Sequence, residues 1–573
     1  MIVTHHPQPT LAMRARYPSI DTSLLAAHFE QADEIAHVRT LAPSFADALP
    51  ETVAAVIEEA ARFGERHLIA LNETMDRVGA RFDNGAVRTA PGHRDAWAAF
   101  IAGRWPSLDH SLEVGGQQLP LSLTLTVQEI FDRCCPAFGM IAVPQRSAAR
   151  LIEAFGDAAQ RAAWLPDLAS GLLGATICIS EAGAGSDVPQ LRTRAVQGPD
   201  NSWRITGEKC WISFGHHDLT ERILHCVLAR TDEASATQPE ISLFLVETGP
   251  NVHVRRIEEK LGLHGSPTCA LGFENAPATL LGTRGRGLQQ MFVMIGQMRL
   301  SVGIMGLGIA SGCLDTALAY AEERKQGGKP GAPVPIVQHV EVQRQLFEMA
   351  ARVEVLRGLV LSAANLADIA RFESDASCRD EAATLLQWLL PLVKTFGAEA
   401  AFDTASDAIQ VLGGAGYTRD WPVEQALRDA RVLAVFEGTS GMQALDFAHR
   451  RMLRDGNGLA AFLRRARSTS NDVRLGRCLD LLEDAAAKIR TMDPRNGDLD
   501  AGADALLRMA MLAAGGWIAG KFLQLPEHSA AHRRMRAAGD YWLEHCVERA
   551  AVCHAEVVKG RARLQHIEAI RRV

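Results

Sequence analysis

Hydrophobic and polar positions divide the chain into helical, strand-like and again helical stretches. Apolar residues recur every three or four positions from about Ser44 to Leu71, and helical spacing resumes over residues 96–100, 121–133 and 148–168. Near Gly174 the pattern changes to short apolar runs rich in β-branched residues, bounded by turn formers such as residues 198–201. These runs predict strands over residues 175–180, 191–195, 203–213, 223–229, 241–246, 252–256 and 270–274.

The second half of the chain has helical spacing throughout. Long amphipathic helices are expected from Leu288 to Arg450, and a further helical block follows a break near residues 456–459. We therefore predict a mainly α protein with a central β domain. Its expected parts are an N-terminal helical domain (1–173), a middle β domain (174–283), a helical bundle (284–453) and a C-terminal helical extension (454–573).

The predicted strands lie too close together in sequence to be joined by crossover helices. Parallel neighbours need a connection of a dozen or more residues, usually a helix. The middle domain is therefore expected to be an antiparallel barrel or sandwich. The polar, glycine-rich segment from Gly79 to Gly92 is expected to be a connector.

Charge is distributed unevenly along the chain. The net charge of −7 over 573 residues argues against nucleic acid as the main partner. Residues 451–573 nevertheless carry 21 Lys and Arg against 15 Asp and Glu, a net charge of +6, while the rest of the chain carries −13. This basic region could contact phosphates, although a solvated helical surface is the more ordinary interpretation.

The eleven cysteines show no CxxC pair and no ligand spacing with histidine. They are expected to be reduced thiols in a cytoplasmic protein, and no metal site is predicted. The first residues contain no apolar signal-peptide core, and no apolar run approaches about 20 residues, so neither a secretory signal nor a membrane span is expected.

One carboxylate stands out, because Glu437 lies between an apolar run (433–436) and a turn of small residues (438–441) that opens a helix. A carboxylate beside an apolar pocket is disfavoured as an anion, which raises its pKa towards that of a general base. The backbone amides of the turn could bind an anion. By itself such a segment is a weak sign of catalysis.

Two segments of the predicted β domain could hold a flat ligand. In Ile179–Asp187 a strand ends in a loop of small residues and hydroxyls, which lets a ligand approach the backbone closely. Within residues 205–213, which resemble two strands joined around Gly207, Trp211 could stack on a ring and Ser213 could donate a hydrogen bond. An ordinary tight turn and a core tryptophan remain the alternatives.

Three further features are weaker signs of a functional site. Arg299 and Arg324 lie on or near the end of one predicted helix, where solvated helix-end charges are common. Residues 410–417 form a glycine-rich helix end, for which a simple C-cap is the ordinary explanation.

Taken in order, these motifs resemble the acyl-CoA dehydrogenase flavoproteins. The resemblance covers about residues 50–450, and it rests on several independent motifs: SEAGAGSD (180–187), ITGEKCWIS (205–213), MRL (298–300), ERK (323–325), QVLGGAGY (410–417) and RDARVLAVFEGTS (428–440). Other sequence segments and the C-terminal helical extension resemble a longer bacterial branch of this family, which includes 3-methylthiopropionyl-CoA dehydrogenase and aryl- or alkyl-acyl-CoA relatives.

The resemblance implies an FAD-dependent α,β-dehydrogenation of an acyl-CoA thioester to the trans-2-enoyl-CoA. Glu437 matches the base that removes the α proton, and the β hydrogen leaves as hydride to the flavin. One family variant carries its base just before Arg299, but residues 296–298 contain no carboxylate, which strengthens Glu437. The implied FAD contacts are Ile179, Ser180, Gly185, Trp211, Ile212, Ser213, Arg324, Gln410, Gly413, Gly414, Gly438, Thr439 and Gly441; Ser186, Arg299 and Glu437 would bind the acyl-CoA.

The resemblance also implies partner proteins, and two alternative functions remain open. An electron-transfer flavoprotein is the expected electron acceptor, and a homodimer or homotetramer is expected because such residues often reach a neighbouring subunit's FAD. Ala182, Gly327 and Phe436 depart from common family residues and leave the acyl specificity open. A flavin-containing, DNA-associated alkylation-response relative using the basic C-terminal region is one alternative, and a flavin monooxygenase, which usually lacks the base, is another.

Overall fold

The computed structural model describes residues 16–232, 239–493 and 495–570. The chain forms two compact units. The sheet unit comprises residues 60–119 and 130–301, and the helical unit comprises the remaining segments, up to residue 59, 120–129 and from 302 onwards. The mainly α fold with a central β domain is confirmed, whereas the bounds of the four predicted domains stay predictions.

The sheet unit contains a seven-stranded sheet whose strand order is β3-β6-β4-β5-β9-β7, with β8 on β9. Because β6 also pairs with β7, strands β6, β4, β5, β9 and β7 form a closed ring of pairings, and the sheet closes as a barrel. The strands are β3 (Leu173–Cys178), β4 (Arg194–Gln197), β5 (Trp203–Ser213), β6 (Arg222–Arg230), β7 (Ile241–Glu247), β8 (Val252–Ile257) and β9 (Thr268–Leu280).

Strand β6 shows how the pattern of side chains builds two cores. Leu224, Cys226 and Leu228 join one apolar cluster, together with residues of α9 (Pro136–Phe155), α10 (Ala158–Ser170) and the first part of α11 (Gly287–Glu323). The alternate residues Val227 and Ala229 join a second cluster formed within the sheet. Successive side chains of a strand point to opposite faces, so β6 is buried on both sides.

Three features of the sheet unit differ from the sequence-based prediction. Strand β3 pairs in parallel with β6, because β4 and β5 supply the crossover for which a helix was thought necessary. The remaining long pairings are antiparallel, as predicted. Within the expected connector, β1 (Arg81–Asp83) and β2 (Ala86–Arg88) form a hairpin, and residues 205–213 belong to one strand rather than two. The other helices of this unit are α6 (Ile69–Val78) and α7 (His93–Ala102).

The helical unit is built around α12 (Val340–Phe372), α13 (Ala376–Leu412) and the second part of α11. Glycines let α11 and α13 approach closely, since a Cβ atom on Gly306 would lie 2.1 Å from the carbonyl oxygen of Gly397. Its shorter helices are α2 (Thr22–Gln31), α3 (Ile35–Val38), α4 (Pro43–Ala46), α14 (Val423–Ala430) and α15 (Ser440–Asp446); α5 (Pro50–Phe63) and α8 (Leu121–Cys134) contain residues of both units.

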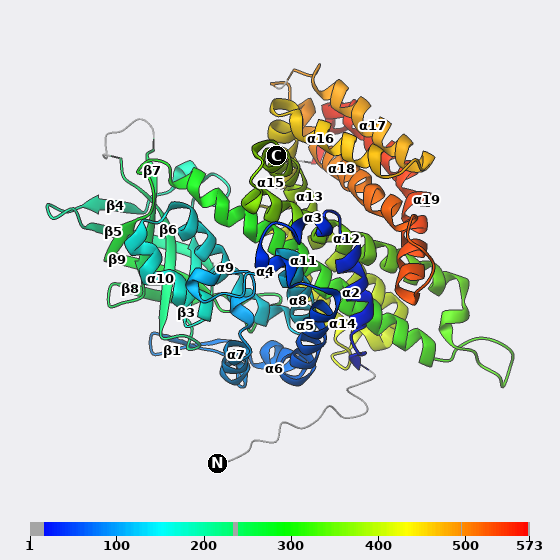
Figure 1. Ribbon diagram of the computed structural model, residues 1–573, viewed down its shortest axis with the longest axis horizontal. Coiled ribbons are helices and arrows are strands. Elements are labelled where there is room, and N and C mark those ends of the chain that lie inside the picture. Colours follow the sequence, from blue (N-terminus) through cyan, green and yellow to red (C-terminus); the bar gives the residue numbers. More distant parts are fainter. Residues whose placement is uncertain (1–15, 233–238, 494, 571–573) are drawn as a thin grey trace, which may run out of the picture. The chain divides into compact units, whose positions relative to one another are not determined.

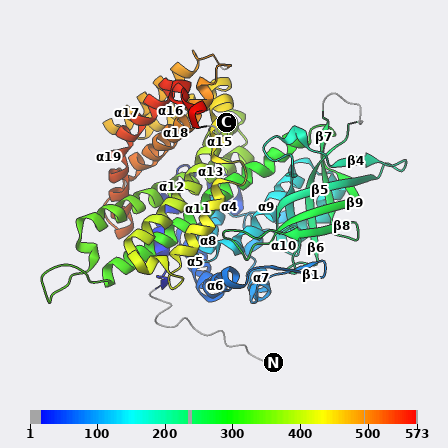
Figure 2. The same cartoon turned by 180° about the vertical axis from the view of Figure 1, so that it is seen from behind.

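The C-terminal extension packs on this helical unit as four helices, which lie side by side in both views (Figures 1 and 2). Arg534 of the extension forms a 2.7 Å ion pair with Glu354 of α12, which is fully buried and also contacts His28. Burial opposes ionisation of Glu354, but Arg357, Arg534 and His28 hold its pKa well below the usual range. The helices are α16 (Asn457–Thr469), α17 (Val473–Ile489), α18 (Asp498–Phe522) and α19 (Ala530–Lys559).

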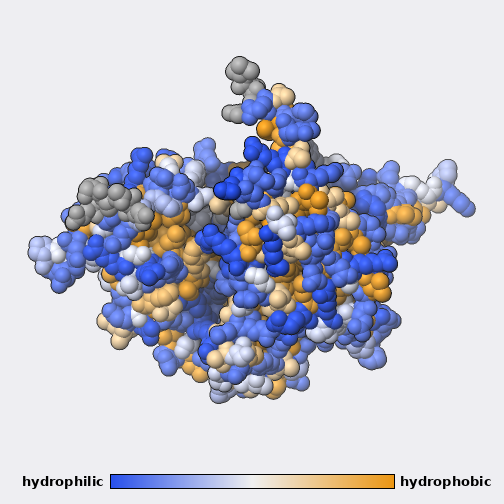
Figure 3. All heavy atoms as spheres, turned by 90° about the horizontal axis from the view of Figure 1, so that it is seen from above, coloured by the Kyte–Doolittle hydropathy of each residue, from blue (hydrophilic) through white to orange (hydrophobic). Residues whose placement is uncertain are grey.

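Arginines of the basic C-terminal region, whose charge raised the nucleic-acid alternative, form intramolecular contacts. Arg464 pairs with Glu381, Arg465 with Asp33 and Glu34, and Arg534 with Glu354. Hydrophilic and apolar residues are interspersed over the face shown in Figure 3. The paired charges therefore weaken the case for a phosphate-binding surface.

Helix α11 is long and apolar enough, by length and composition, to cross a membrane. In this structure, however, 78% of its most apolar window is buried inside the protein. A buried core helix accounts for this composition.

Candidate active site

The loop after β3, residues 179–187, is held by a buried ion pair. Lys209 of β5 is fully buried, and its Nζ donates to the Glu181 carboxylate (2.8 Å) and to the Ile179 carbonyl oxygen (2.9 Å). The same carboxylate accepts the backbone N–H groups of Arg192 (2.7 Å) and Thr193 (3.1 Å). One charged pair thus fixes the start of this loop and the segment that follows it.

The ion pair also shifts the pKa values of its two side chains. Burial opposes ionisation of Glu181, but Lys209 and the hydrogen bonds outweigh it, so the pKa of Glu181 lies below its usual value. Burial lowers the pKa of Lys209, and the Glu181 carboxylate counteracts that effect. A buried pair of this kind is costly to break, because removing one partner leaves an uncompensated charge.

The end of β5 presents an exposed aromatic side chain. The pairing of β5 with β9 shifts between Lys209 and Ile212, so Trp211 lies in a bulge with φ of 63° and a side chain 61% exposed. The Cys210 N–H donates to the Ser180 carbonyl oxygen at 3.0 Å. The structure therefore brings Ser180 beside the segment carrying Trp211, Ile212 and Ser213, as the motifs led us to expect.

The first part of helix α11 carries Arg299, the remaining residue of the sheet unit that was predicted to belong to the site. Met298, next to Arg299, belongs to the buried cluster against which Ile179 packs. Arg299 itself is half-buried. Gly185 and Ser186 lie exposed further along the loop, and a Cβ atom on Gly183 or Gly185 would meet nothing within 4 Å.

In the helical unit, Glu437 lies in a left-handed turn held by two buried side chains. Glu437 has φ of 54° and Gly438 has φ of 89°. Gln443 Nε2 donates to the Glu437 carbonyl oxygen at 2.9 Å, and Lys394 Nζ donates to the Gly438 carbonyl oxygen at 2.8 Å. Both Gln443 and Lys394 are fully buried. A non-glycine residue at positive φ is strained, and such strain clusters at functional sites.

The surroundings of Glu437 match the sequence-based expectation in part. Thr439 caps α15 by accepting the Met442 N–H at 3.2 Å, so a helix does begin there. Leu433 is buried, but Val435 is 51% exposed, and Glu437 is half-buried. The run before the base is thus less uniformly buried than its composition led us to expect.

The remaining predicted FAD residues lie on the surface of the helical unit. Arg324 directly follows α11, and Gln410 lies near the end of α13. Gly413 is the C-cap of that helix, with φ of 61°. All four of these residues, Gly414 included, are exposed, as are Thr439 and Gly441, and a Cβ atom on Gly413 or Gly414 would meet nothing within 4 Å. Their exposure distinguishes them from Glu437 and Gly438, which are half-buried.

Four supporting residues escaped the sequence reasoning as functional candidates: Glu181, Lys209, Lys394 and Gln443. Glu181 and Lys209 lie inside the quoted motifs but were passed over for their neighbours. Lys394 had a usable signal, because it is a single lysine within the apolar run 389–396. Gln443 offered no such signal.

Each unit has features that would suit part of a bound FAD. An exposed tryptophan beside a loop of small residues offers a flat apolar surface with backbone groups nearby. The open glycines after α13 likewise leave a backbone that a large ligand can approach closely.

Models of the three acyl-CoA dehydrogenase domains match the chain: the N-terminal domain over residues 50–172, the middle domain over 176–276 and the C-terminal domain over 285–453. Fold and site thus define an FAD-containing oxidoreductase that acts on acyl-CoA. The chain belongs to the acyl-CoA dehydrogenase family.

Individual similar proteins and structures support the same family. The 3-methylmercaptopropionyl-CoA dehydrogenase of Ruegeria pomeroyi is 34% identical over 459 residues, 78% of this chain and 77% of that protein. The structure of an acyl-CoA dehydrogenase complexed with FAD from Bacillus anthracis covers 95% of this chain and 94% of its own, with a TM-score of 0.70 at 18% identity, which shows the fold. A structure described as the electron transferring flavoprotein of Acidaminococcus fermentans covers 71% of this chain and 99% of its own, with a TM-score of 0.61 at 28% identity.

Proposed function

We propose that Glu437 is the general base that removes the α proton of a bound acyl-CoA thioester, giving the trans-2-enoyl-CoA. The observation that carries this proposal is the turn at Glu437, whose backbone is held by the buried side chains of Lys394 and Gln443. A base held in one position needs less reorganisation when the proton is transferred. When bound, FAD supplies the acceptor for the hydride that leaves the β carbon.

The other residues divide between the two units by task. In the sheet unit, Ile179, Ser180, Gly185, Trp211, Ile212 and Ser213 bind the flavin, while Ser186 and Arg299 bind the CoA thioester. In the helical unit, Gly438, Thr439 and Gly441 bind FAD beside the base, and the exposed Arg324, Gln410, Gly413 and Gly414 bind FAD phosphates and adenosine. The exposure of this last group fits a homodimer or homotetramer in which it reaches the partner subunit's FAD.

The proposed physiological setting is a reducing compartment with a protein electron acceptor. All eleven cysteines are free thiols, nine of them buried, which fits the cytoplasm. The similarity to a structure described as an electron transferring flavoprotein supports such a protein as acceptor.

The decisive experiment is anaerobic reduction of the bound flavin by substrate in the wild type and in Glu437→Gln. The variant should retain FAD and bind acyl-CoA but reduce its flavin about 10²–10⁴-fold more slowly, because proton transfer by a positioned base contributes about that factor. Glu424→Gln, which removes a carboxylate from an ion pair with Arg428 elsewhere in the helical unit, is the matched control and should reduce normally. Wild-type rates in Glu437→Gln would refute the assignment.

The substrate is found by the same assay over a panel of acyl-CoA thioesters with short, branched, aryl and thioether chains. A thioether chain belongs in the panel because a relative is named for one. If no acyl-CoA bleaches the flavin of the wild type, α,β-dehydrogenation is not the reaction.

A further inference from the structure

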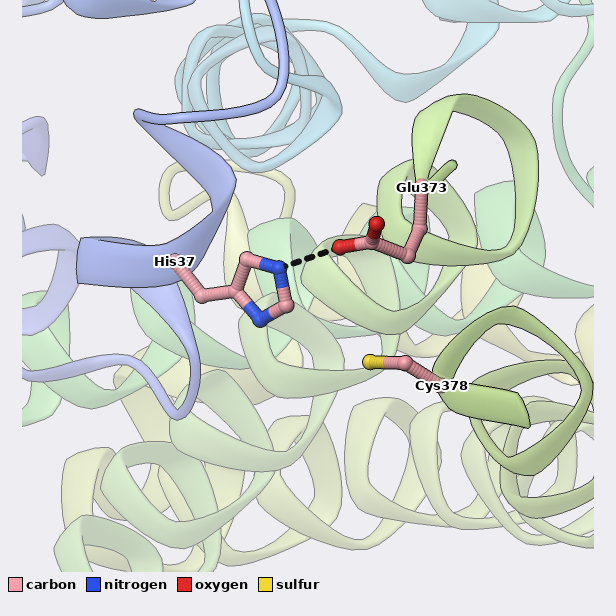
Figure 4. A group of neighbouring side chains, drawn as sticks. All are labelled: His37, Glu373 and Cys378. Carbon is pink, nitrogen blue, oxygen red and sulfur yellow. Dashed lines mark hydrogen bonds and ion pairs between the residues drawn. The ribbon is translucent and has the colours of Figure 1, made fainter. Parts of the chain in front are cut away.

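A second cluster of reactive side chains lies in the helical unit, away from the residues assigned to catalysis. A cavity of about 390 Å³ opens between α3, α12, α13 and α16. His37 of α3 and Cys378 of α13 line it, and Glu373, the C-cap of α12, lies beside them. Figure 4 shows the three side chains pointing toward one another from these separate segments.

The ligand atoms of this cluster are close enough to share one ion. One nitrogen of His37, one oxygen of Glu373 and the sulfur of Cys378 all lie within 4.8 Å of one another. His37 Nε2 and Glu373 Oε2 are 2.6 Å apart. Around zinc, with bonds of about 2.0–2.3 Å, ligand atoms are separated by roughly 3.5 Å, so small side-chain rotations suffice.

Hydrogen bonds already orient two of the ligands. Glu373 Oε1 accepts the Asp375 N–H at 2.9 Å and the Ser374 hydroxyl at 3.2 Å, which turns Oε2 toward His37. His37 Nδ1 faces the Glu34 carboxylate at 3.7 Å, leaving Nε2 directed at the cluster. A carboxylate behind the second histidine nitrogen is the usual support of a histidine that ligates zinc.

The charges around the cluster favour a cation. Glu34, Glu373, Asp375 and Glu381 all interact electrostatically with the Cys378 thiol. Glu34 and Glu381 have arginine partners in Arg465 and Arg464, whereas the ion-pair partner of Glu373 in the described structure is His37. A bound divalent cation would compensate the Glu373 carboxylate and would be ligated by Cys378 as the thiolate.

We propose that His37, Glu373 and Cys378 bind one zinc-type divalent cation per chain, with water from the cavity completing a tetrahedral site. Sulfur, imidazole and carboxylate together select borderline first-row ions rather than Mg²⁺ or Ca²⁺. Binding displaces the thiol proton of Cys378 to solvent, with no change in oxidation state. The site would join the N-terminal segment to α12 and α13, and it keeps one coordination position for water.

The test uses the full-length, FAD-loaded protein stripped of metals with a chelator. Zinc content is measured after dialysis against a slight excess of Zn²⁺, and Co²⁺ is titrated while ligand-field bands are recorded at wavelengths longer than flavin absorption. The variants are Cys378→Ser and His37→Gln, and Cys553→Ser is the control because Cys553 is the other half-buried thiol. FAD content and circular dichroism report whether each variant is folded.

The wild type and Cys553→Ser should retain one zinc per chain and show tetrahedral cobalt bands. Cys378→Ser and His37→Gln should bind about tenfold more weakly or worse while keeping FAD. Failure of the wild type to retain zinc would overturn the proposal, and so would undiminished binding in folded Cys378→Ser. These readouts do not depend on acyl-CoA turnover, so they are separate from the test of Glu437.

Discussion

The two units each bury one lysine beneath a predicted part of the active site, and the lysines are used differently. In the sheet unit, Lys209 pairs with the Glu181 carboxylate and so fixes the loop through a side chain. In the helical unit, Lys394 donates to the Gly438 carbonyl oxygen and so fixes the turn at Glu437 through the backbone.

In the helical unit, the residues that hold the turn are therefore different from the side chain proposed to act as the base. Lys394 and Gln443 donate to backbone carbonyl oxygens of the turn, and these oxygens are present whichever side chain occupies position 437. In the sheet unit, the Glu181 carboxylate is itself the support, so any change there alters the loop. The comparison predicts that each lysine matters, but by different amounts and with different pH dependence.

The largest effect on stability is expected from Lys209→Met, which leaves Glu181 as an uncompensated buried charge. The free energy of unfolding of the sheet unit should fall by about 3–5 kcal/mol, with loss of bound FAD. Chemical denaturation followed by flavin fluorescence measures both, and Lys559→Met on the exposed face of α19 is the control. The double variant Lys209→Met/Glu181→Gln should cost less than the sum of its single changes; strict additivity would mean that the two side chains are not coupled.

Lys394→Met should have a smaller effect on stability, because the Gly438 carbonyl oxygen that loses its donor carries no formal charge. A loss of about 1–3 kcal/mol is expected, together with slower flavin reduction as the turn at Glu437 loosens. Stopped-flow reduction at saturating acyl-CoA separates the rate from substrate binding. An unchanged rate in this variant would mean that Lys394 does not position the base.

Acid should weaken the sheet-unit contact selectively. Because the pKa of Glu181 is depressed in the folded protein, its stabilising effect is fully present above its ordinary pKa and is lost as the pH falls through the depressed value. The stability difference between the wild type and Glu181→Gln should therefore shrink below about pH 4.5. Denaturation curves over a pH series show this; the difference between the wild type and Lys394→Met should not follow the same course.

The smallest effect is expected for the stability of Glu437→Gln. Lys394 and Gln443 hold the turn through its backbone, and glutamine has nearly the size and shape of glutamate, so the free energy of unfolding should stay within about 0.5 kcal/mol of the wild type even though dehydrogenation is lost. Differential scanning calorimetry gives this value. A large loss of stability would show that the Glu437 side chain is itself part of the support.

Most of the fold could be predicted because local pattern decides the local structure. The apolar, β-branched run predicted a strand over residues 203–213, the bounds of β5 in the structure, although the break expected around Gly207 did not occur. The parallel pairing of β3 with β6 escaped prediction because strand partners are chosen by distant segments. The β1–β2 hairpin escaped because three-residue strands carry too little pattern.

The candidate site divides in the same way. The motifs located Trp211, Ser180 and Glu437, and the structure added that Trp211 and Glu437 both lie at positive φ. Lys394 was missed because its partner, Gly438, is 44 residues away in sequence. The cluster of His37, Glu373 and Cys378 was invisible for the same reason, since two of its members are more than 300 residues from the third.

The sequence by itself determined the family and the order of helices and strands, and it singled out Glu437 as the proposed base, because these depend on residue type and on short-range spacing. Only the tertiary structure decided what holds each part in place. The buried lysines, the closure of the barrel through β6 and β7, and the thiol beside His37 all depend on contacts between distant segments. Packing of the whole chain makes those contacts, and no local pattern encodes them.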